Sequence, residues 1–375
     1  MALSITENNS LVLHLCRFLN PDKAALEGLM GSSPGWAYVL GQLLYNRMGA
    51  VAYGVLEKTG LLGKTGREFR GALKTAYEDG YRRSVSYRQS LEMVGGLLEA
   101  ASFPYAALKG AYLCGAYPAG MRTSNDIDLL VNQADVSAAE GMLKPAGFLQ
   151  GSVRNGDFVR ASRADVLDSR INRGETVPFI KRVRLPGMEY LEVDVNFSLD
   201  YQARHGASSV ATLLKGTQPL IIAGRSFLYT LPHSDFLLHL CCHLYKEATT
   251  YAWVVMDRDL SLYKFADIYL LLNEWKNECV LKELVVRAYE LGVCKAAYYS
   301  LLHTKELFGI DDPALELMLE AISPHDKGFL REVHRPEGNR TYRYDERFTD
   351  WLFLGGRCSR LYEINAVNND RGDGQ

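Results

Sequence analysis

Long apolar runs are missing from this sequence of 375 residues, because no stretch reaches the roughly 18 apolar residues of a membrane-spanning helix. The seven cysteines contain no CxxC pair. An odd number of scattered cysteines favours reduced thiols over a disulfide framework. The N-terminus lacks the basic segment and the small-residue cleavage site of a secretory signal. Together these absences predict a protein of the cytoplasm.

A strong charge of either sign is also lacking. The formal net charge is −2 at pH 7, so the overall composition does not point to nucleic acid or an anionic membrane, and any basic site must be local. Hydrophobic residues make up 47% and charged residues 23%, which is ordinary for a globular protein. At roughly 100–200 residues per domain, the length predicts two or three structural units.

The pattern of apolar residues predicts an α+β core between two helical regions. Helical spacing predominates over residues 1–101 and 231–362. Short apolar strands alternate with short helices over 102–230, which predicts a small mixed sheet with covering helices. A stretch near 151–188 holds eight basic and four acidic residues and is interpreted as a basic insert. The polar tail 363–375 is expected to be disordered.

Four segments of the core have the apolar pattern of strands, and two have that of helices. Pro186-Gly187, between the last two strands, is a hairpin turn signal. The expected strands are 105–108, 127–131, 177–185 and 189–197, and the expected helices are 111–117 and 136–143.

Two aspartates stand two residues apart at the second of these strands. Side chains at positions i and i+2 share a face, so Asp126 and Asp128 project together while Ile127 and Leu129 face a core. Two carboxylates this close repel each other, and burying them unpaired is costly. Mg²⁺ removes this cost, because it prefers oxygen ligands and uses one or two carboxylates plus substrate phosphates. Asp126 and Asp128 are therefore candidate metal ligands.

A third carboxylate is expected from the strand 189–197. Its apolar residues alternate with Glu192, Asp194 and Asn196, so these polar side chains share one face. Asp194 is the preferred third ligand, because Glu192 lies nearer the hairpin turn.

The segment before the two aspartates fits a phosphate site. Lys109-Gly110 follows a predicted strand and precedes a predicted helix. A glycine there lets the backbone approach phosphate, and the helix N-terminus offers N–H groups and positive potential. Lys109 and Arg122 are cations that could offset the charge of a triphosphate.

These residues resemble the motif block of a known family. The pattern LKG…Y…R…DIDLLV is typical of an uncharacterised bacterial nucleotidyltransferase family in the DNA polymerase β superfamily. The likeness covers about residues 105–275 and includes helical blocks that contain His239, His243 and Asp267. The matching residues of the motif block are Leu108-Lys109-Gly110, Tyr117, Arg122 and Asp126-Ile127-Asp128-Leu129-Leu130-Val131.

The resemblance implies a five-stranded mixed sheet and an enzyme that uses two Mg²⁺ ions. The enzyme would transfer a nucleoside monophosphate from a nucleoside triphosphate to an acceptor nucleophile and release pyrophosphate. Asp126 and Asp128 would hold both ions, and Asp194 would hold the catalytic one. For the acceptor, a small molecule, a peptide or a protein is favoured over nucleic acid because the net charge is near zero. Asn196 stands where family members tend to have histidine.

Two other functions fit parts of the sequence. Ala111 stands where the superfamily usually has glycine or serine, and the missing serine favours a non-catalytic nucleotide sensor or partner-binding module on the same fold. His239 and His243 lie four residues apart on a predicted helix and could ligate Zn²⁺ with His233 or Cys242. The alternative is that these histidines pack against the sheet or line the nucleotide cleft.

Two surface segments have open roles. The basic insert 151–188 could bind a triphosphate or an acidic acceptor, or could be solvated surface. The segment 340–347 mixes arginines with tyrosines, as nucleic-acid sites do, but the near-neutral net charge speaks against that use.

Overall fold

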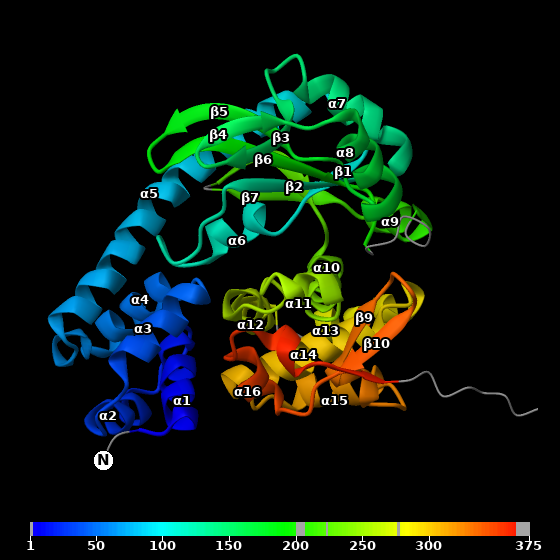
Figure 1. Cartoon of the computed structure of the whole chain (residues 1–375). Helices are drawn as coiled ribbons and strands as arrows, with labels where there is room; N and C mark the ends of the chain where they lie inside the picture. Colours follow the sequence, from blue (N-terminus) through cyan, green and yellow to red (C-terminus); the bar gives the residue numbers. More distant parts are fainter. Residues whose placement is uncertain (1–2, 200–206, 223, 276–277, 365–375) are drawn as a thin grey trace, which may run out of the picture.

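The computed structural model describes residues 3–199, 207–222, 224–275 and 278–364. A mixed sheet with covering helices lies above a layer of C-terminal helices, and the N-terminal helices extend to one side (Figure 1). The fold therefore combines α and β structure with a mixed sheet, as the sequence predicts. None of the described helices is both long enough and apolar enough to cross a membrane.

The N-terminal region forms helices, as predicted. The first helix begins with a capping box, in which the Ser4 hydroxyl accepts from the Glu7 backbone and the Glu7 carboxylate accepts from the Ser4 backbone. The fifth helix has 32 residues and is long enough to reach from the other N-terminal helices to the sheet. The helices are α1 (Ile5–Cys16), α2 (Lys23–Gly31), α3 (Trp36–Tyr45), α4 (Gly49–Thr59) and α5 (Arg67–Leu98).

The central sheet has six strands in the described part of the chain, so the five strands implied by the resemblance are too few. The order is β1-β2-β6-β5-β3-β4, and β2 and β6 are parallel while the other neighbours are antiparallel. The strands are β1 (Tyr105–Ala107), β2 (Asp126–Val131), β3 (Leu149–Arg154), β4 (Asp157–Arg160), β5 (Phe179–Leu185) and β6 (Met188–Asn196).

The additional edge of the sheet comes from the basic insert. β3 and β4 form a hairpin that pairs with β5 through β3. Most residues of the two strands are exposed or half-buried, so they lack the apolar alternation by which the sequence analysis recognised strands. The hairpin is followed by α8 (Arg163–Asp168) and a π-helical turn at Ser169–Arg173.

The two faces of the sheet have different coverings. Tyr87, Leu91 and Val94 of α5 share a hydrophobic core with Leu191 and Val193 of β6. The helix α7 (Val136–Leu143) joins α5 on this face (Figure 1). The helix α6 (Gly110–Ala116) connects β1 to the loop before β2. The C-terminal helices lie below the opposite face, and α10 is nearest to it.

After β6 the chain is mainly helical and has two small sheets that the sequence does not lead us to expect. One is the hairpin β7–β8, and the other has the order β11-β10-β9. The helices are α9 (Ala207–Leu214), α10 (His233–Ala248), α11 (Tyr251–Val255), α12 (Leu262–Glu274), α13 (Glu278–Glu290), α14 (Cys294–Phe308), α15 (Pro313–Ala321) and α16 (Phe348–Leu352). The strands are β7 (Gln218–Ile222), β8 (Arg225–Thr230), β9 (Glu332–Arg335), β10 (Arg340–Arg343) and β11 (Tyr362–Ile364). Of the predicted disordered tail, residues 365–375 lie outside the described residues.

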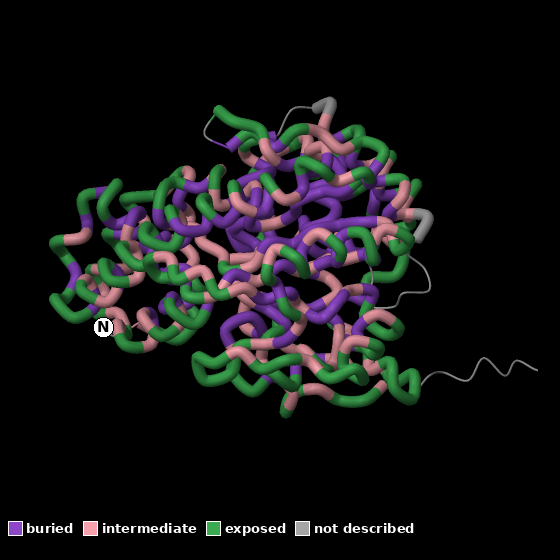
Figure 2. The backbone as a smooth tube through the Cα atoms, turned by 90° about the horizontal axis from the view of Figure 1, so that it is seen from above, coloured by how far each residue is buried: buried purple, intermediate pink, exposed green. Residues whose placement is uncertain are grey.

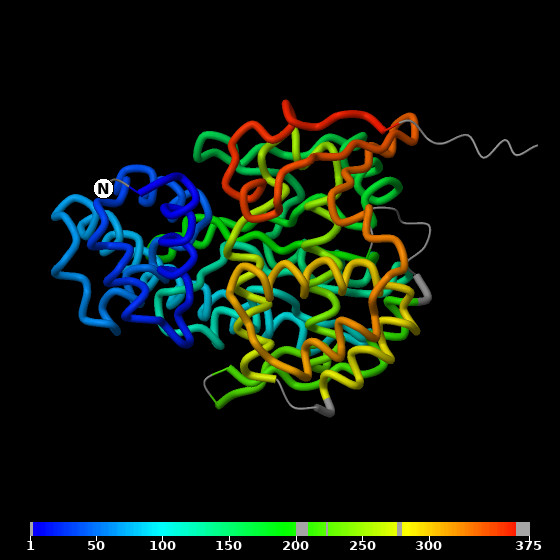
Figure 3. Tube along the Cα trace, turned by 90° about the horizontal axis from the view of Figure 1, so that it is seen from below, coloured from blue at the N-terminus to red at the C-terminus, as the bar shows by residue number. Residues whose placement is uncertain are grey.

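One hydrophobic core joins the two ends of the chain. Leu11 and Leu15 of α1 belong to the same buried cluster as Phe265 and Ile268 of α12. Figure 2 shows the buried backbone running through the sheet and the helices beside it. Figure 3 shows the N-terminal helices beside the layer that holds the C-terminal helices. The N-terminal helices are therefore packed against the C-terminal region as well as against one another.

The arginine- and tyrosine-rich segment 340–347 is engaged within the protein. Arg343 bonds to Glu332 at 2.6 Å, and Arg347 bonds to Asp350 at 2.8 Å. The Tyr344 ring is buried and stacks on Trp351 with ring centroids 4.0 Å apart. Arg343, Tyr344 and Arg347 therefore have structural contacts within the protein.

We expect Asp259→Asn to destabilise the protein by about 3–5 kcal/mol, because it leaves the Arg357 cation buried without its partner. Both residues are 0% exposed, and Arg357 Nε lies 2.9 Å from Asp259 Oδ2. Asp350→Asn, which breaks the exposed pair with Arg347, should cost less than about 1 kcal/mol. Denaturant unfolding of both variants checks this, and equal losses would contradict it.

Candidate functional site

Strand register brings the three predicted aspartates together. In the parallel pair β2–β6, Asp126 lies opposite Glu192 and Asp128 lies opposite Asp194. Partners in register project to the same face, so four carboxylates occupy one patch of the sheet. We call Asp126, Asp128, Glu192 and Asp194 the carboxylate cluster. Glu192 was passed over in the sequence analysis because it is close to the hairpin turn, but the register makes it the neighbour of Asp126.

Lys109 is the cation closest to this cluster in the described structure. Its Nζ donates a hydrogen bond to Asp128 Oδ1 at 2.6 Å. Its backbone has φ 44° and ψ −112°, an unusual left-handed conformation for a residue with a side chain. Such conformations persist only where the surrounding structure enforces them, and they are concentrated at functional sites. The unusual turn directs the ammonium to Asp128 rather than into solvent.

The cluster holds more negative charge than one ammonium can balance. Burial, the nearby carboxylates Asp128 and Glu192, and to a lesser extent Asp126 raise the pKa of Asp194 well above its ordinary value. Burial raises the pKa of Asp128 despite the opposing effect of Lys109. Burial and the carboxylates of Asp126 and Asp128 raise the pKa of Glu192 to about 7. Protons or further cations therefore have to compensate the crowded carboxylates.

The donor set fits Mg²⁺, although the side chains are not gathered around a metal position. Within the described ranges, no three His, Cys, Asp or Glu side chains converge closely enough to hold a metal ion. Lys109 engages Asp128, and the Ser124 hydroxyl bonds to the Asp126 carboxylate. The Oδ1 atom of Asp194 is buried and has no hydrogen-bond partner among the described residues. An unsatisfied buried carboxylate oxygen beside other carboxylates is a position that a hard divalent cation would stabilise.

Gly110 is required by close packing. A Cβ atom on this residue would lie 2.8 Å from Ser124 Cβ and 2.9 Å from Tyr87 Oη. The Tyr87 hydroxyl in turn donates to the Asp126 carbonyl at 2.9 Å. From the sequence, we expect this glycine to let the backbone approach phosphate. In the structure, the close approach is made by the loop that leads into β2.

Arg122 is held by the C-terminal region. Its guanidinium makes a bidentate ion pair with Asp267 of α12, with Nε–Oδ1 at 3.0 Å and Nη2–Oδ2 at 3.1 Å. It also lies over the Tyr263 ring, 5.0 Å from the centroid. Both charged groups are largely buried. Arg122 was expected to offset triphosphate charge, but its partner in this structure is Asp267, and the pair ties the loop before β2 to α12.

His239 and His243 lie on α10, and their parallel rings have centroids 6.5 Å apart. Burial and the charge of Lys109 lower the pKa of His239 to about 3 and lower that of His243 well below its ordinary value. Both rings are therefore neutral at pH 7. They lie close enough to Lys109 for its positive charge to lower their pKa values. His243 Nε2 lies 3.4 Å from Glu247 Oε2, and among the described residues no group of three His, Cys, Asp or Glu side chains around these rings is arranged to hold a metal ion.

Two further charged residues belong to this region. Glu175 forms an isolated bridge with Asn196 at the end of β6, and its charge acts on both Asp128 and Lys246. Burial lowers the pKa of Lys246, and Lys109 lowers it further. Lys246 follows His243 by about one turn of α10, so the helical spacing alone could have placed it on the same side of the helix as His243. The bridge of Glu175 leaves no pattern in the sequence.

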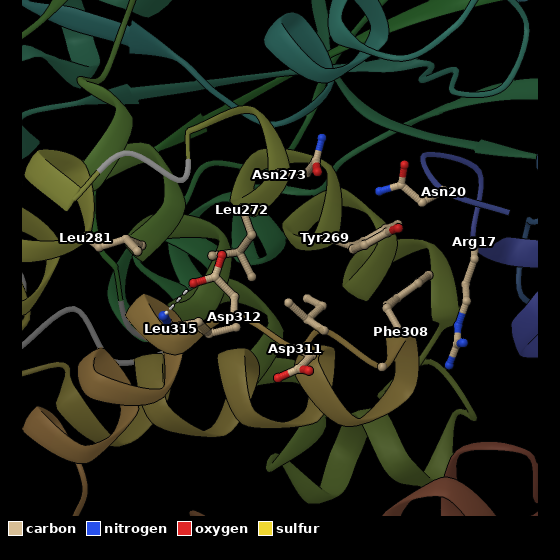
Figure 4. Close-up of a pocket in the computed structure, with 12 residues that line it drawn as sticks. Arg17, Asn20, Tyr269, Leu272, Asn273, Leu281, Phe308, Asp311, Asp312 and Leu315 are labelled. Carbon is tan, nitrogen blue, oxygen red and sulfur yellow. Dashed lines mark hydrogen bonds between the residues drawn. The ribbon is translucent and has the colours of Figure 1, made fainter. Parts of the chain in front are cut away.

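The structure has a cavity beside the carboxylate cluster and another away from it. The first has a volume of about 290 Å³ and is lined by Glu192, Asn125 and Tyr190, among others. The second, of about 250 Å³, lies between the end of α1 and the helices α12, α14 and α15 (Figure 4). Its lining includes Tyr269 and Arg17 and has no residue in common with the carboxylate cluster. The candidate site therefore adjoins the first of these two cavities and not the second.

Comparison with known families gives one match. The profile of a protein family described as an uncharacterised nucleotidyltransferase matches residues 32–309, about three quarters of the chain. The matched range contains every residue of the candidate site described above. A comparison with curated proteins finds no match.

We expect Gly110→Ala to lower the free energy of unfolding by about 1–3 kcal/mol, because the new methyl group overlaps Ser124 and Tyr87. Gly115→Ala is the matched control in the same helix, since a Cβ there meets nothing within 4 Å. That substitution should be neutral or stabilise the helix by up to about 1 kcal/mol. Denaturant unfolding measures both, and a stable Gly110→Ala protein would refute the packing argument.

The Glu192 carboxyl should make the metal-free protein less stable as the pH rises. Its pKa is raised from 4.5 to about 7 on folding. Its contribution to stability is therefore fully present below pH 4.5 and is lost as the pH rises through about 7, by at most about 3 kcal/mol. Glu192→Gln should remove this part of the pH dependence and be more stable than the wild type at pH 8. Glu189→Gln, at an exposed position, should retain the wild-type slope when unfolding is measured with a chelator present.

Proposed function

Because the chain belongs to the uncharacterised nucleotidyltransferase family, we propose that it transfers a nucleoside monophosphate from a nucleoside triphosphate to an acceptor nucleophile and depends on Mg²⁺. The observation that carries this proposal is the register of β2 and β6. It sets Asp128 opposite Asp194, and Asp194 has a buried oxygen without a partner among the described residues. Carboxylates crowded in this way are costly unless a cation accompanies them.

Each residue of the site has a role in this proposal. Asp126, Asp128 and Asp194 would hold the metal ions, and Glu192 adds a fourth carboxylate at the edge of the set. Bound Mg²⁺ would polarise the phosphoryl oxygens and lower the pKa of the attacking hydroxyl. Lys109 would exchange its bond to Asp128 for the phosphates of the nucleotide.

The reaction forms one bond and breaks one. The acceptor oxygen or nitrogen bonds to the α-phosphorus, the bond from the α-phosphorus to the pyrophosphate oxygen breaks, and the acceptor proton passes to water. Little covalent chemistry is required of the protein, because positioning and charge stabilisation supply most of the catalysis in phosphoryl transfer. Arg122 and Asp267 are positioning residues in this scheme, since their ion pair fixes the loop that leads to Asp126.

A non-catalytic nucleotide sensor is the second candidate. Two observations favour it: both cations expected to bind phosphate are already paired with carboxylates, Lys109 with Asp128 and Arg122 with Asp267. Such a protein would bind nucleotide without releasing pyrophosphate. Measuring nucleotide binding and pyrophosphate release on the same protein separates the two functions.

We expect Asp194→Asn to reduce turnover by more than about a hundred-fold while the fold is retained. The substitution removes a metal ligand and one charge from a crowded cluster, so stability should hold or rise. The assay is pyrophosphate release from the four nucleoside triphosphates with Mg²⁺ and a pooled extract of small-molecule and peptide acceptors. Asp157→Asn, at the exposed start of β4, is the control and should behave as the wild type. Turnover by Asp194→Asn near the wild-type rate, or none by the wild type with any nucleotide, would contradict the proposal.

A further inference from the structure

A hollow on the sheet continues from the carboxylate cluster towards the β5–β6 turn. The cavity of about 290 Å³ starts at Glu192 and Asn125. A more open hollow of about 540 Å³ adjoins it and shares part of its wall, including Arg83 and Glu189. We call the two hollows together the outer trough. Its residues are Arg83, Asn125, Val153, Gly156, Ile180, Arg182, Arg184, Leu185, Gly187, Met188, Glu189, Tyr190 and Glu192.

The strand order places this trough across the carboxylate cluster from Lys109. Lys109 follows β1 at one edge of the sheet, and the next two strands, β2 and β6, carry the cluster. Ile180 lies on β5, the strand beyond, directly opposite Glu192. Opposed residues share a face, so the floor of the trough continues the face that bears the carboxylates. Lys109, the carboxylate cluster and the Ile180 end of the trough therefore follow one another across this face, and the outer end of the trough reaches Arg83 of α5 beside the β5–β6 turn.

The lining changes in character along the trough. Next to Glu192 the surface is partly apolar, with the buried Ile180 and the half-buried Tyr190. The Arg182 guanidinium lies 5.8 Å from the centroid of the Tyr190 ring and pairs with Glu189. A small ligand could therefore bury an apolar portion against Tyr190 and Ile180 while its ends meet polar groups.

The outer end of the trough is positively charged. Three arginines line this end. Arg182 pairs with Glu189, whereas Arg83 of α5 and Arg184 of β5 have no ion-pair partner in the described structure. Arg184 has φ 52° at an irregularity in the β5–β6 pairing. Bulges of this kind change the direction of a side chain and are common beside active sites. Guanidiniums bind carboxylates and phosphates through paired N–H groups.

We propose that the outer trough binds the acceptor of the transfer reaction, and that this acceptor is a small molecule carrying an anionic group, a carboxylate or a phosphate, held by Arg83 and Arg184. The inference rests on the proposed nucleotidyl transfer. Attacking and leaving groups lie roughly in line in phosphoryl transfer. With the departing pyrophosphate next to Lys109 and α6, the acceptor approaches from the far side of the carboxylate cluster, where the trough lies.

Other occupants fit the trough less well. A nucleobase could stack on Tyr190, but it is uncharged and gives Arg83 and Arg184 no counter-charge. A nucleoside triphosphate bound with its phosphates at these arginines would carry its leaving group away from Lys109 and α6. A volume of about 290 Å³ beside Glu192 suits a small molecule.

The test uses probes that share a phenyl ring and differ in charge. We would titrate 4-hydroxyphenylacetate and tyramine into the full chain with Mg²⁺ and follow binding by ligand-observed NMR, with phenyl phosphate as the phosphate probe. One or both anionic probes should bind, and tyramine should bind at least ten-fold more weakly. Arg83→Ala and Arg184→Ala should each weaken the anionic probes by about ten-fold. Arg88→Ala, at an exposed position on the same helix outside the trough, should leave the affinity unchanged.

The same titrations with a non-hydrolysable ATP analogue distinguish a failure of the acceptor-site proposal from a failure of the proposed nucleotidyl transfer. The analogue should bind wild type, Arg83→Ala and Arg184→Ala with equal affinity and should not displace the anionic probes. Competition between the analogue and the probes would assign the trough to the nucleotide and overturn the inference. Equal binding of tyramine, no loss in either arginine variant, or no binding of any anionic probe would overturn it as well. Failure of the analogue to bind the wild type would instead count against nucleotidyl transfer itself.

Discussion

The structure depends on one electrostatic constraint: four carboxylates share a face of two neighbouring strands, and Lys109 is paired directly with one of them. Asp128, opposite Asp194, is 3% exposed, so water screens little of the repulsion. The surrounding elements reduce this cost. The unusual backbone at Lys109 delivers an ammonium to Asp128, and the Ser124 hydroxyl bonds to Asp126. A site that is incompletely neutralised by the protein is suited to ligands that bring positive charge with them.

The site is assembled from parts of the chain that are far apart in sequence. Tyr87 of α5 bonds to the backbone of Asp126, and Asp267 of α12 holds Arg122 in the loop before it. Buried bidentate pairs such as Arg122–Asp267 contribute geometric specificity, because both partners must be in place to avoid an isolated buried charge. The position of the Asp126 carboxylate is therefore coupled to both helical regions. Those regions help to determine the geometry of the site as well as covering it.

Local patterns in the sequence predicted the centre of the site, while its partners depended on contacts that the sequence does not display. The alternation of apolar and polar residues predicted that Asp126, Asp128 and Asp194 share a face. The register that pairs Asp126 with Glu192 is set by packing between strands about sixty residues apart, so Glu192 was undervalued. β3 and β4 lacked an apolar pattern because they form the exposed edge of the sheet. The ion pair between Arg122 and Asp267 joins residues 145 positions apart, so no local sequence pattern predicts it.

The shared core of the two chain ends has a consequence for how the protein is made. Leu11 and Leu15 are buried together with Phe265 and Ile268, which are synthesised some 250 residues later. At roughly 5–20 residues per second, the ribosome needs on the order of 10–50 seconds to supply these partners. During that interval α1 can pack against α2, α3 and α4, but the part of its apolar surface that faces the later helices stays uncovered. This core is therefore completed only after the strands of the sheet, which lie between the two segments in the sequence, have been synthesised.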